Sequence, residues 1–456
     1  MAVGTIDTSI LTDIANAIRY KAGVATLYKP REMAAAVAAL DGSDAGGYVP
    51  QPYMQLESGV LSESVFSDIA DAIRGQNGLS TTYAPGDMAQ AILDLVWDVG
   101  VKCRAMLLTD GTLEFNYRDG RSSDHGTIAR CWEVDVAGYG SDSARPWHEV
   151  RAQVRRVVFD ADFSDAGMTN LAYWCTGMSS MTEVLGFEEC SGATSVQQMF
   201  TSCGALETIW ATSFDNSKIS SYTSVFYGCN RLVGGTGWVP SSTAGKAAVS
   251  LGSSGALTNP ANDQRTWVWG YLYDDGALEV SASSVADASR EVLYGGRVCC
   301  NAHYTAISAM PWYDGRASLT SCVFKADLAS VTMSSLDYWF YGETALASVT
   351  GWANVRGLVS ARYLFNGCTG VTTLDLRGLD PSALKDYFYM FAGCSSLVTI
   401  YVDSTWALAS GASGMGTFYN CRAIVGGNGT TYSASAYGYA RAVIDRAGQV
   451  GYLTAS

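Results

Sequence analysis

The chain has 456 residues, of which 48% are hydrophobic and 16% are charged, so it has ample material for buried cores and is not a disordered protein. Its 29 basic and 43 acidic residues give a formal net charge of -14, which disfavours nucleic acid as a partner. No stretch approaches the roughly 20 apolar residues of a membrane span, so membrane insertion is not expected.

The N-terminal segment carries two copies of one helical pattern. IANAIRYKAGVATLYKPREMAAAV (14–37) aligns with IADAIRGQNGLSTTYAPGDMAQAI (69–92). Isoleucines one helical turn apart, Ile14 and Ile18 in the first copy, predict an apolar helix face, and a glycine and a proline then mark a stop and a second helix. The start of the chain lacks a basic segment followed by an uninterrupted apolar one, so no secretory signal is expected. We predict three N-terminal segments: a helical unit over 1–42, a linker over 43–60 and a second helical unit over 61–98.

Two short motifs read as β-hairpin turns. TDGTLE (109–114) and DDGALE (274–279) each place Asp-Gly between alternating apolar residues, which predicts a tight hairpin. The same motifs contain paired carboxylates that would suit glycoside hydrolysis: Asp110 with Glu114, and Asp275 with Glu279. We favour the turn because the motif is sufficient for it on its own.

The remainder of the chain contains a short repeat. MFAGCSSLVTI (390–400) recurs in four further places: MFTSCGALETI, VFYGCNRLVGG, LFNGCTGVTTL and TFYNCRAIVGG. A weaker copy, WFYGETALASV, has Glu343 in the Cys place. The structural repeat positions are Phe200, Cys203, Phe226, Cys229, Phe365, Cys368, Phe391, Cys394, Phe418 and Cys421. With Phe340 of the weaker copy, the phenylalanines form two groups, and within each group successive ones lie 25 to 27 residues apart. This period is within the range of leucine-rich-type repeats, so each copy is predicted to form one coil of a solenoid.

A larger duplication contains the short repeat. A shift of 165 residues aligns the two hairpin motifs and the coils that follow them, and the second copy then has one extra coil. A stack in which each coil contacts only its neighbours tolerates such a gain. We predict two tandem leucine-rich-type repeat solenoid domains, over 101–262 and 266–456, and a mixed α+β fold for the whole chain.

The repeats resemble the BspA-like leucine-rich repeat family, whose coils often read F-x-x-C-x-x-L, over most of residues 150–456. Members include surface adhesins of anaerobic bacteria, some protist surface proteins and tail-associated phage proteins. The pattern IADAIR…YAPGDMAQAI, present twice, resembles segments of phage and prophage tail and fibre proteins. Together the two resemblances imply a virion component, which needs no secretory signal because lysis delivers it outside the host.

Cysteine and histidine offer no catalytic or metal-binding pattern. The repeat cysteines occupy one place in successive coils and are predicted to be buried, reduced thiols rather than disulfides. No paired C-x-x-C suggests zinc, and of the three histidines, His148 aligns with Tyr313, so the duplicated fold does not depend on it. We expect no catalytic residues, no cofactor and no metal ligands.

Aromatic residues are the remaining candidates for binding. In TWVWGYLY (266–273), aromatic residues alternate, so one strand face is expected to carry all four, as a core seam or as a platform for sugar or protein. Three tyrosines near the coil phenylalanines are further candidates. The candidate set is Trp267, Trp269, Tyr271, Tyr273, Tyr341, Tyr389 and Tyr419.

The sequence thus predicts a non-enzymatic phage tail fibre or receptor-binding protein, located in the virion tail and extracellular after host lysis. Residues 1–98 are expected to attach it to other tail or baseplate proteins, and the repeats to recognise a bacterial surface receptor, glycan or protein. A homo-oligomer is expected, with a trimer favoured by analogy to other fibres. The alternatives are a bacterial surface adhesin of the same repeat family and a glycan-degrading tail enzyme.

Overall fold

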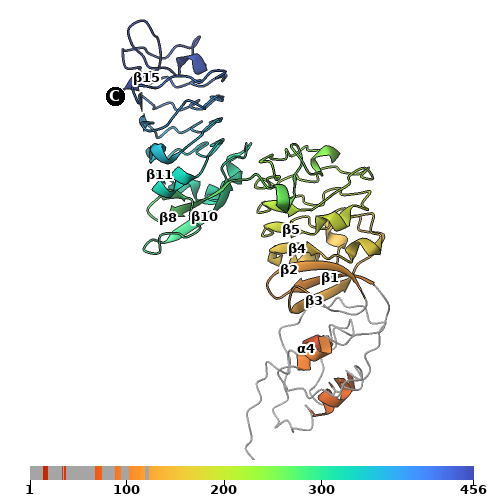
Figure 1. Ribbon diagram of the computed structural model, residues 1–456. Helices are drawn as coiled ribbons and strands as arrows, with labels where there is room; N and C mark the ends of the chain where they lie inside the picture. The colour runs from red at the N-terminus through yellow and green to blue at the C-terminus, as the bar shows by residue number, and fades with distance from the viewer. Residues whose placement is uncertain are drawn as a thin grey trace, which may run out of the picture. The chain divides into compact units, whose positions relative to one another are not determined.

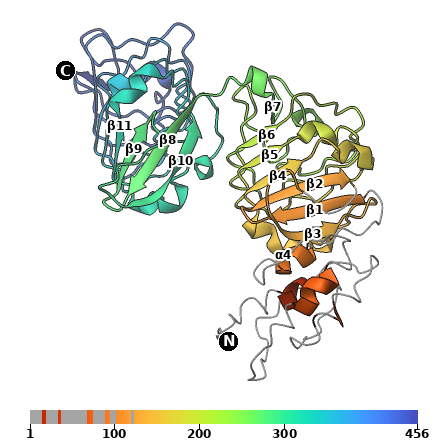
Figure 2. The ribbon, with the colours of Figure 1, turned by 60° about the horizontal axis from the view of Figure 1, so that its bottom comes forward.

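The computed structural model describes residues 14–18, 33, 35–36, 67–73, 88–93, 102–118 and 123–456 (Figures 1 and 2). It divides into two compact units. Unit 1 comprises Met1–Cys203 with Phe214–Val225, and unit 2 comprises Gly204–Ser213 with Phe226–Ser456. The described residues form few helices and many strands, so the mixed class predicted from the sequence is confirmed.

The described part of the N-terminal region is helical. Residues 14–18 and 67–73 form helical segments, and α4 spans Met88–Leu93. Residues that the duplication aligns are buried in both copies: Ile14 and Ile69, Ile18 and Ile73, and Met33 and Met88. The rest of the predicted helical units, and the predicted linker over 43–60, lie outside the described residues.

Unit 1 contains a hairpin that is extended by parallel strands. Its strands are β1 (Lys102–Leu108), β2 (Thr112–Arg118), β3 (Ile128–Glu133), β4 (Arg156–Phe159) and β5 (Glu183–Leu185). β1 pairs antiparallel with β2 and β3, whereas β4 pairs parallel with β2 and β5. The turn between β1 and β2 contains Gly111 with a left-handed φ of 88°, so the predicted Asp-Gly hairpin is confirmed.

Unit 2 contains a second hairpin and short parallel strands. They are β6 (Thr208–Trp210), β7 (Leu257–Thr258), β8 (Trp267–Tyr273), β9 (Ala277–Ser281), β10 (Val292–Cys299), β11 (Ser321–Phe324), β12 (Ser348–Thr350), β13 (Thr373–Asp375), β14 (Thr399–Val402) and β15 (Leu453–Ala455). One sheet has the order β10-β8-β9-β11-β12 and another the order β13-β14-β15, while β6 pairs with β7. β8 and β9 form the second predicted Asp-Gly hairpin.

Short 3₁₀ helices connect the strands. In unit 1 they are η2 (Asp142–Ala144), η3 (His148–Gln153), η4 (Phe163–Ala166) and η5 (Phe187–Cys190). In unit 2 they are η6 (Lys246–Ala248), η7 (Pro260–Asn262), η8 (Ile307–Ala309), η9 (Tyr313–Ser318), η10 (Ala326–Ser330), η11 (Trp352–Asn354) and η12 (Tyr439–Arg441). No helix in the described part of the chain is long and apolar enough to cross a bilayer.

The repeat copies of unit 2 stack as successive turns of the chain. A column of parallel bridges runs through Ser335, Ser360, Asp386 and Ser413. Inside the stack, phenylalanine rings lie in a second column. The centroid distances are 5.5 Å for Phe340–Phe365, 5.9 Å for Phe365–Phe391 and 5.3 Å for Phe391–Phe418, with the rings within 18° of parallel. In Figure 1 these turns follow one another from β11 to β15 near the C-terminus. The apolar column therefore holds each turn against the next.

The repeat cysteines line the same interior. All twelve cysteines are buried and form no disulfide bond, as predicted for the repeat positions. Each of three thiols also donates to a backbone carbonyl of the preceding turn: Cys368 to Phe340 at 2.9 Å, Cys394 to Phe365 at 2.9 Å and Cys421 to Phe391 at 2.8 Å. Burial raises the pKa of Cys368, so its thiol stays protonated and keeps its donor. The repeat thiols therefore act as hydrogen-bond donors as well as apolar filler.

Candidate binding surface

Each repeat turn of unit 2 contains a residue with left-handed backbone two places before the stacked phenylalanine. These residues are Tyr338 (φ 66°), Tyr363 (φ 53°) and Tyr389 (φ 51°), and in the next turn Gly416 (φ 67°). A residue with a side chain pays of order 1 kcal/mol in this conformation, which glycine adopts freely. Three turns of this chain therefore have a tyrosine at a position where the fourth turn has glycine, the residue that adopts this conformation without strain.

Backbone hydrogen bonds between turns fix these three positions. The N–H of Tyr338 donates to the next turn at 3.0 Å, that of Tyr363 at 2.9 Å and that of Tyr389 at 3.0 Å. Because the turns are one strand spacing apart, the side chains project in register. The ring centroids of Tyr338 and Tyr363 lie 4.7 Å apart, and those of Tyr363 and Tyr389 lie 5.4 Å apart with their planes within 4°. We call Tyr338, Tyr363 and Tyr389 the tyrosine ladder.

The ladder is only partly covered by the protein. All three residues are half-buried. Tyr363 has a stacked neighbour on each face, so its ring presents an edge and a hydroxyl rather than a face. Burial raises the pKa of Tyr338 to about 12 and also raises that of Tyr363, so both hydroxyls remain protonated donors at neutral pH.

More exposed rings flank the ladder at its two ends. Tyr341 is 38% exposed and lies 5.4 Å from Tyr338, and Tyr419 is 46% exposed and lies 6.4 Å from Tyr389. Tyr419 stands nearly perpendicular to Tyr389 and also to Tyr437, 5.6 Å away. Three of the aromatic residues singled out in the sequence, Tyr341, Tyr389 and Tyr419, therefore lie together on one surface.

The charged groups beside the ladder are paired. The guanidinium of Arg362 lies 4.9 Å from the ring centroid of Phe388 and 3.5 Å from the carboxylate of Asp386. His303 contacts the buried carboxylate of Asp337 through Nδ1 at 2.8 Å, and this hydrogen bond raises the pKa of His303. The second oxygen of Asp337 accepts the N–H of Arg362 at 2.9 Å.

The aromatic residues of β8 differ in how far the protein covers them. Trp267, Trp269 and Tyr271 are half-buried, and Tyr273 is fully buried beneath Arg290, whose guanidinium carbon lies 3.8 Å from the ring centroid. The alternation predicts all four on one face, but the last ring of the strand has no exposed surface for a ligand.

Trp267 belongs to a network that ties neighbouring segments of unit 2 together. The guanidinium carbons of Arg265 and Arg297 lie 5.2 Å and 4.3 Å from its ring centroid. Arg297 donates to Glu207 at 2.5 Å, and Arg265, which also lies over Trp210 at 5.1 Å, is almost fully buried. Such cation–π and ion-pair contacts attach the 204–213 turn to the β8 hairpin.

No family model matches the chain, and no curated protein matches it.

Two solved structures show a distant likeness. One is a leucine-rich repeat protein from Eubacterium ventriosum, 13% identical, with the match covering 73% of this chain and 95% of that one at a TM-score of 0.22. The other is a leucine rich cell surface protein from Faecalibacterium prausnitzii, also 13% identical, covering 71% of this chain and 91% of that one at a TM-score of 0.21. At these TM-scores the likeness supports no conclusion about this chain, and the repeating turns rest on its own hydrogen bonds.

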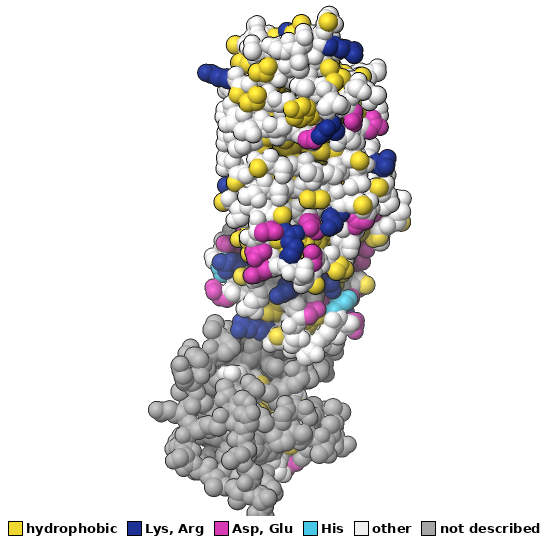
Figure 3. Space-filling view, turned by 90° about the vertical axis from the view of Figure 1, so that its left-hand side faces the viewer, with side chains coloured by type: hydrophobic (Ala, Val, Ile, Leu, Met, Phe, Trp, Pro, Cys, Tyr) yellow, Lys and Arg dark blue, Asp and Glu magenta, His cyan; other side chains and the backbone are white. Residues whose placement is uncertain are grey.

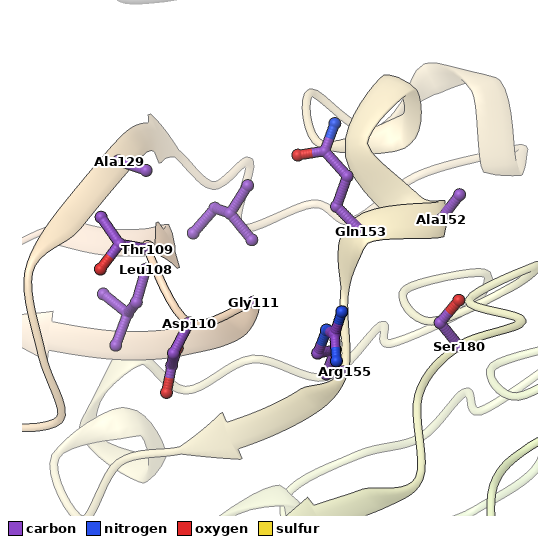
Figure 4. Close-up of a pocket in the computed structure, with 10 residues that line it drawn as sticks. Leu108, Thr109, Asp110, Gly111, Ala129, Ala152, Gln153, Arg155 and Ser180 are labelled. Carbon is purple, nitrogen blue, oxygen red and sulfur yellow. The ribbon is translucent and has the colours of Figure 1, made fainter.

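Asp110 and Glu114, the first carboxylate pair that suggested glycoside hydrolysis, do not line one common cavity. In unit 1, a hollow of about 720 Å³ is lined by Asp110 on the hairpin turn, Arg155 before β4 and Ser180 on a neighbouring turn (Figure 4). Asp110 accepts the N–H of Thr112 at 2.8 Å, which lowers its pKa. Glu114 is fully buried in β2 and does not line the hollow. The two carboxyl groups therefore do not face a common space.

The matching carboxylates of unit 2, Asp275 and Glu279, both form ion pairs with Arg290. Asp275 accepts the N–H of Ala277 at 3.0 Å and both oxygens contact Arg290, which also bonds Glu279 at 2.9 Å. Among the described residues, no group of three or more His, Cys, Asp or Glu side chains could hold a metal ion.

Sequence reasoning missed two rungs of the ladder and its neighbours. Tyr338, Tyr363, Phe388 and Tyr437 lie on the same surface as the predicted tyrosines but were not singled out. The signal was available, because the position two places before the coil phenylalanine reads Tyr338, Tyr363 and Tyr389 in three successive repeats.

Proposed function

We propose that this chain is a non-enzymatic phage tail fibre or receptor-binding protein. Its repeats would form two tandem solenoid domains that recognise a bacterial host surface, and residues 1–98 would attach it to other tail or baseplate proteins. The observation that carries the proposal is the tyrosine ladder: aromatic rings in register on a rigid stack of turns, a surface with low conformational entropy to lose on binding.

The face shown in Figure 3 supports contact with a polar, hydrated partner. On the face shown in Figure 3, acidic and basic side chains are intermixed and hydrophobic ones are scattered among them. Such a surface does not resemble the apolar core of an obligate interface. Several copies acting together would convert weak individual contacts into useful adsorption, and for this reason we propose a homo-oligomer, with a trimer favoured by analogy.

A bacterial cell-surface adhesin with the same repeats would use the same ladder. The two functions differ in where the protein resides. Mass spectrometry of purified phage particles from the source strain is expected to detect the chain as a virion component. Its presence in the cell-wall fraction of uninduced cells, and not in particles, would establish the adhesin instead.

The binding test uses the purified full chain and host cells. We expect saturable adsorption that competes with phage attachment and leaves the wall polymers intact. Release of reducing sugar during incubation, abolished by changing one Asp or Glu, would show that an active site exists and would replace the proposal with a glycan-degrading tail enzyme.

A further inference from the structure

The spacing of the ladder selects among linear partners. Its ring centroids repeat at 4.7 Å and 5.4 Å along the direction in which the turns stack. An extended peptide presents same-face side chains only every ~6.7 Å, so it would fall out of register within two or three turns. One pyranose unit of an extended glycan advances by about the same length as one turn, so a sugar chain stays in register.

The chemistry of the ladder also suits a sugar chain. The inner rung, Tyr363, offers an edge and a hydroxyl, and phenol hydroxyls both donate and accept hydrogen bonds, as sugar hydroxyls do. The end rings, Tyr341 and Tyr419, are the most exposed of the set and provide apolar surface for the C–H face of a pyranose.

Charge at the ladder disfavours an anionic polymer. Arg362, next to Tyr363 in the chain, is already paired with Asp386, and His303 is paired with Asp337. A phosphate- or carboxylate-bearing chain would have to displace these carboxylates and would also meet a protein of net charge -14. A neutral chain meets neither cost.

We infer that the tyrosine ladder binds a neutral glycan chain laid along the stacking direction, from Tyr341 in the first turn to Tyr419 in the fourth. This deepens the proposed function and rests on it. The span covers three turn spacings, about 14 Å, so a ligand needs about three to four sugar units to contact both end rings. Affinity should therefore rise with chain length up to that size and then level off.

The test uses the full chain in native gels containing dextran, mannan, xylan or glucomannan, and in matched gels containing polygalacturonate or hyaluronate. At least one neutral polymer is expected to retard the protein, and the anionic ones are not. Oligosaccharides of two to six units from the retarding polymer, titrated by calorimetry, should show the predicted length dependence. Retardation by the anionic polymers alone, or by none of the neutral ones, overturns the inference.

The decisive variant is the double substitution Tyr363→Asn with Tyr389→Asn. Asparagine tolerates left-handed backbone better than tyrosine, so the turns should keep their fold while losing two rungs. Binding should weaken at least about tenfold. Gln198→Asn, at the matching left-handed position of unit 1 (φ 52°), is the control and should bind like the parent. Equal retardation of the double variant and the parent excludes the ladder as the site.

Adsorption to host cells, measured on the same samples, separates this inference from the proposed function. Saturable cell binding that the double variant loses, with no neutral glycan bound in gels, refutes the glycan class and leaves the receptor-binding function standing. Absence of cell binding by the parent protein refutes the receptor-binding function, and absence of retardation by neutral polymers in the same samples refutes the glycan inference as well.

Discussion

In unit 1 a buried arginine covers the first repeat turn, whereas in unit 2 the matching turn contains a buried glutamic acid. Arg145, only 2% exposed, donates to the carbonyls of Tyr173 at 2.6 Å and Trp174 at 2.5 Å, and also to that of Thr176. The duplication aligns Arg145 with Met310, so unit 2 lacks this donor at that place.

Glu343 of unit 2 is the counterpart of Met178 in unit 1 and stands where later turns have cysteine. It is fully buried, and neither carboxyl oxygen hydrogen-bonds to any described residue. Burial raises its pKa to about 8, so the group is protonated at neutral pH and carries a hydroxyl donor, as the thiols of the later turns do. Each unit thus buries a different ionisable side chain at its first turn, Arg145 in unit 1 and Glu343 in unit 2.

The two units also differ in the side chains at the left-handed position of each turn. Unit 2 has the tyrosine ladder there, whereas unit 1 has Tyr173, Gln198 and Ser224, with φ values of 68°, 52° and 55°. The backbone conformation is shared and only the side chains differ. The turn geometry is therefore a property of the repeat, and the ladder is a property of unit 2 alone.

The largest expected effect is the pH dependence introduced by Glu343. Its usual pKa is 4.5 and its folded pKa is about 8, so between these values the unfolded chain ionises while the folded chain stays protonated. The contribution of Glu343 to stability is fully present below about pH 4.5 and is lost as pH rises through 8, by about 1.4 kcal/mol per pH unit and up to about 5 kcal/mol in total. Urea unfolding of the parent at pH 5, 6, 7 and 8 measures this slope.

Two variants control for Glu343. Glu343→Gln removes the titration, and Glu343→Met copies the residue of unit 1, so both should flatten the slope and exceed the stability of the parent at pH 8. Hydrogen exchange in turns 336–424 should report the same change. A parent slope that survives both substitutions would mean that other groups, His303 among them, set the pH dependence.

The second effect concerns Arg145 itself. Arg145→Met gives unit 1 the residue of unit 2, and removes the donor of three carbonyls of the first turn. We expect a loss of about 3 kcal/mol, because hydrogen bonds to a charged donor are among the stronger ones and the carbonyls remain buried. The reciprocal Met310→Arg should destabilise unit 2, because it buries a charged side chain in place of an apolar one. If Arg145→Met has the same urea midpoint as the parent, other groups must donate hydrogen bonds to the carbonyls of Tyr173, Trp174 and Thr176.

Much of the architecture could be predicted from the sequence because it is local or repeated. The Asp-Gly hairpins follow from four-residue turn chemistry, and the stacked phenylalanines and buried cysteines follow from their period. The mixed class and the interior of the turns were predictable for the same reason, since a repeated apolar position can only face a shared core.

The site could be predicted only in part, since it depends on the sign of φ at one position per turn. The residue type at positions 338, 363 and 389 does not show that the backbone is left-handed there. That conformation decides in which direction the tyrosine rings project. Alternation in β8 likewise could not show that Arg290 covers Tyr273. The repeat places Glu343 at a buried cysteine position, but it could not show that the two carboxyl oxygens would lack a hydrogen-bond partner among the described residues.

A smaller effect tests whether the repeat thiols act as donors. Cys394→Ala removes the hydrogen bond to the carbonyl of Phe365 and leaves a small void, for which we expect a loss of about 1–3 kcal/mol. Cys394→Ser should cost less, because a hydroxyl can donate to the same carbonyl. Urea unfolding of the two variants gives the order. If serine costs more than alanine, the thiol is apolar filler alone, as the sequence pattern suggested.

The smallest effect on stability, and the sharpest test of the comparison, comes from building the ladder in unit 1. Gln198→Tyr with Ser224→Tyr places three tyrosines in register at positions whose backbone is already left-handed, beginning with Tyr173. Each new ring pair should contribute only about 0.5–1 kcal/mol, so the urea midpoint should change little. If side chains alone separate the units, calorimetry should show a second site for the neutral oligosaccharide bound by unit 2, weaker because Thr176 stands where unit 2 has Tyr341. A folded variant with an unchanged number of sites would show that the ladder needs Tyr341, and the new ladder combined with Tyr363→Asn and Tyr389→Asn would then bind no better than that double variant alone.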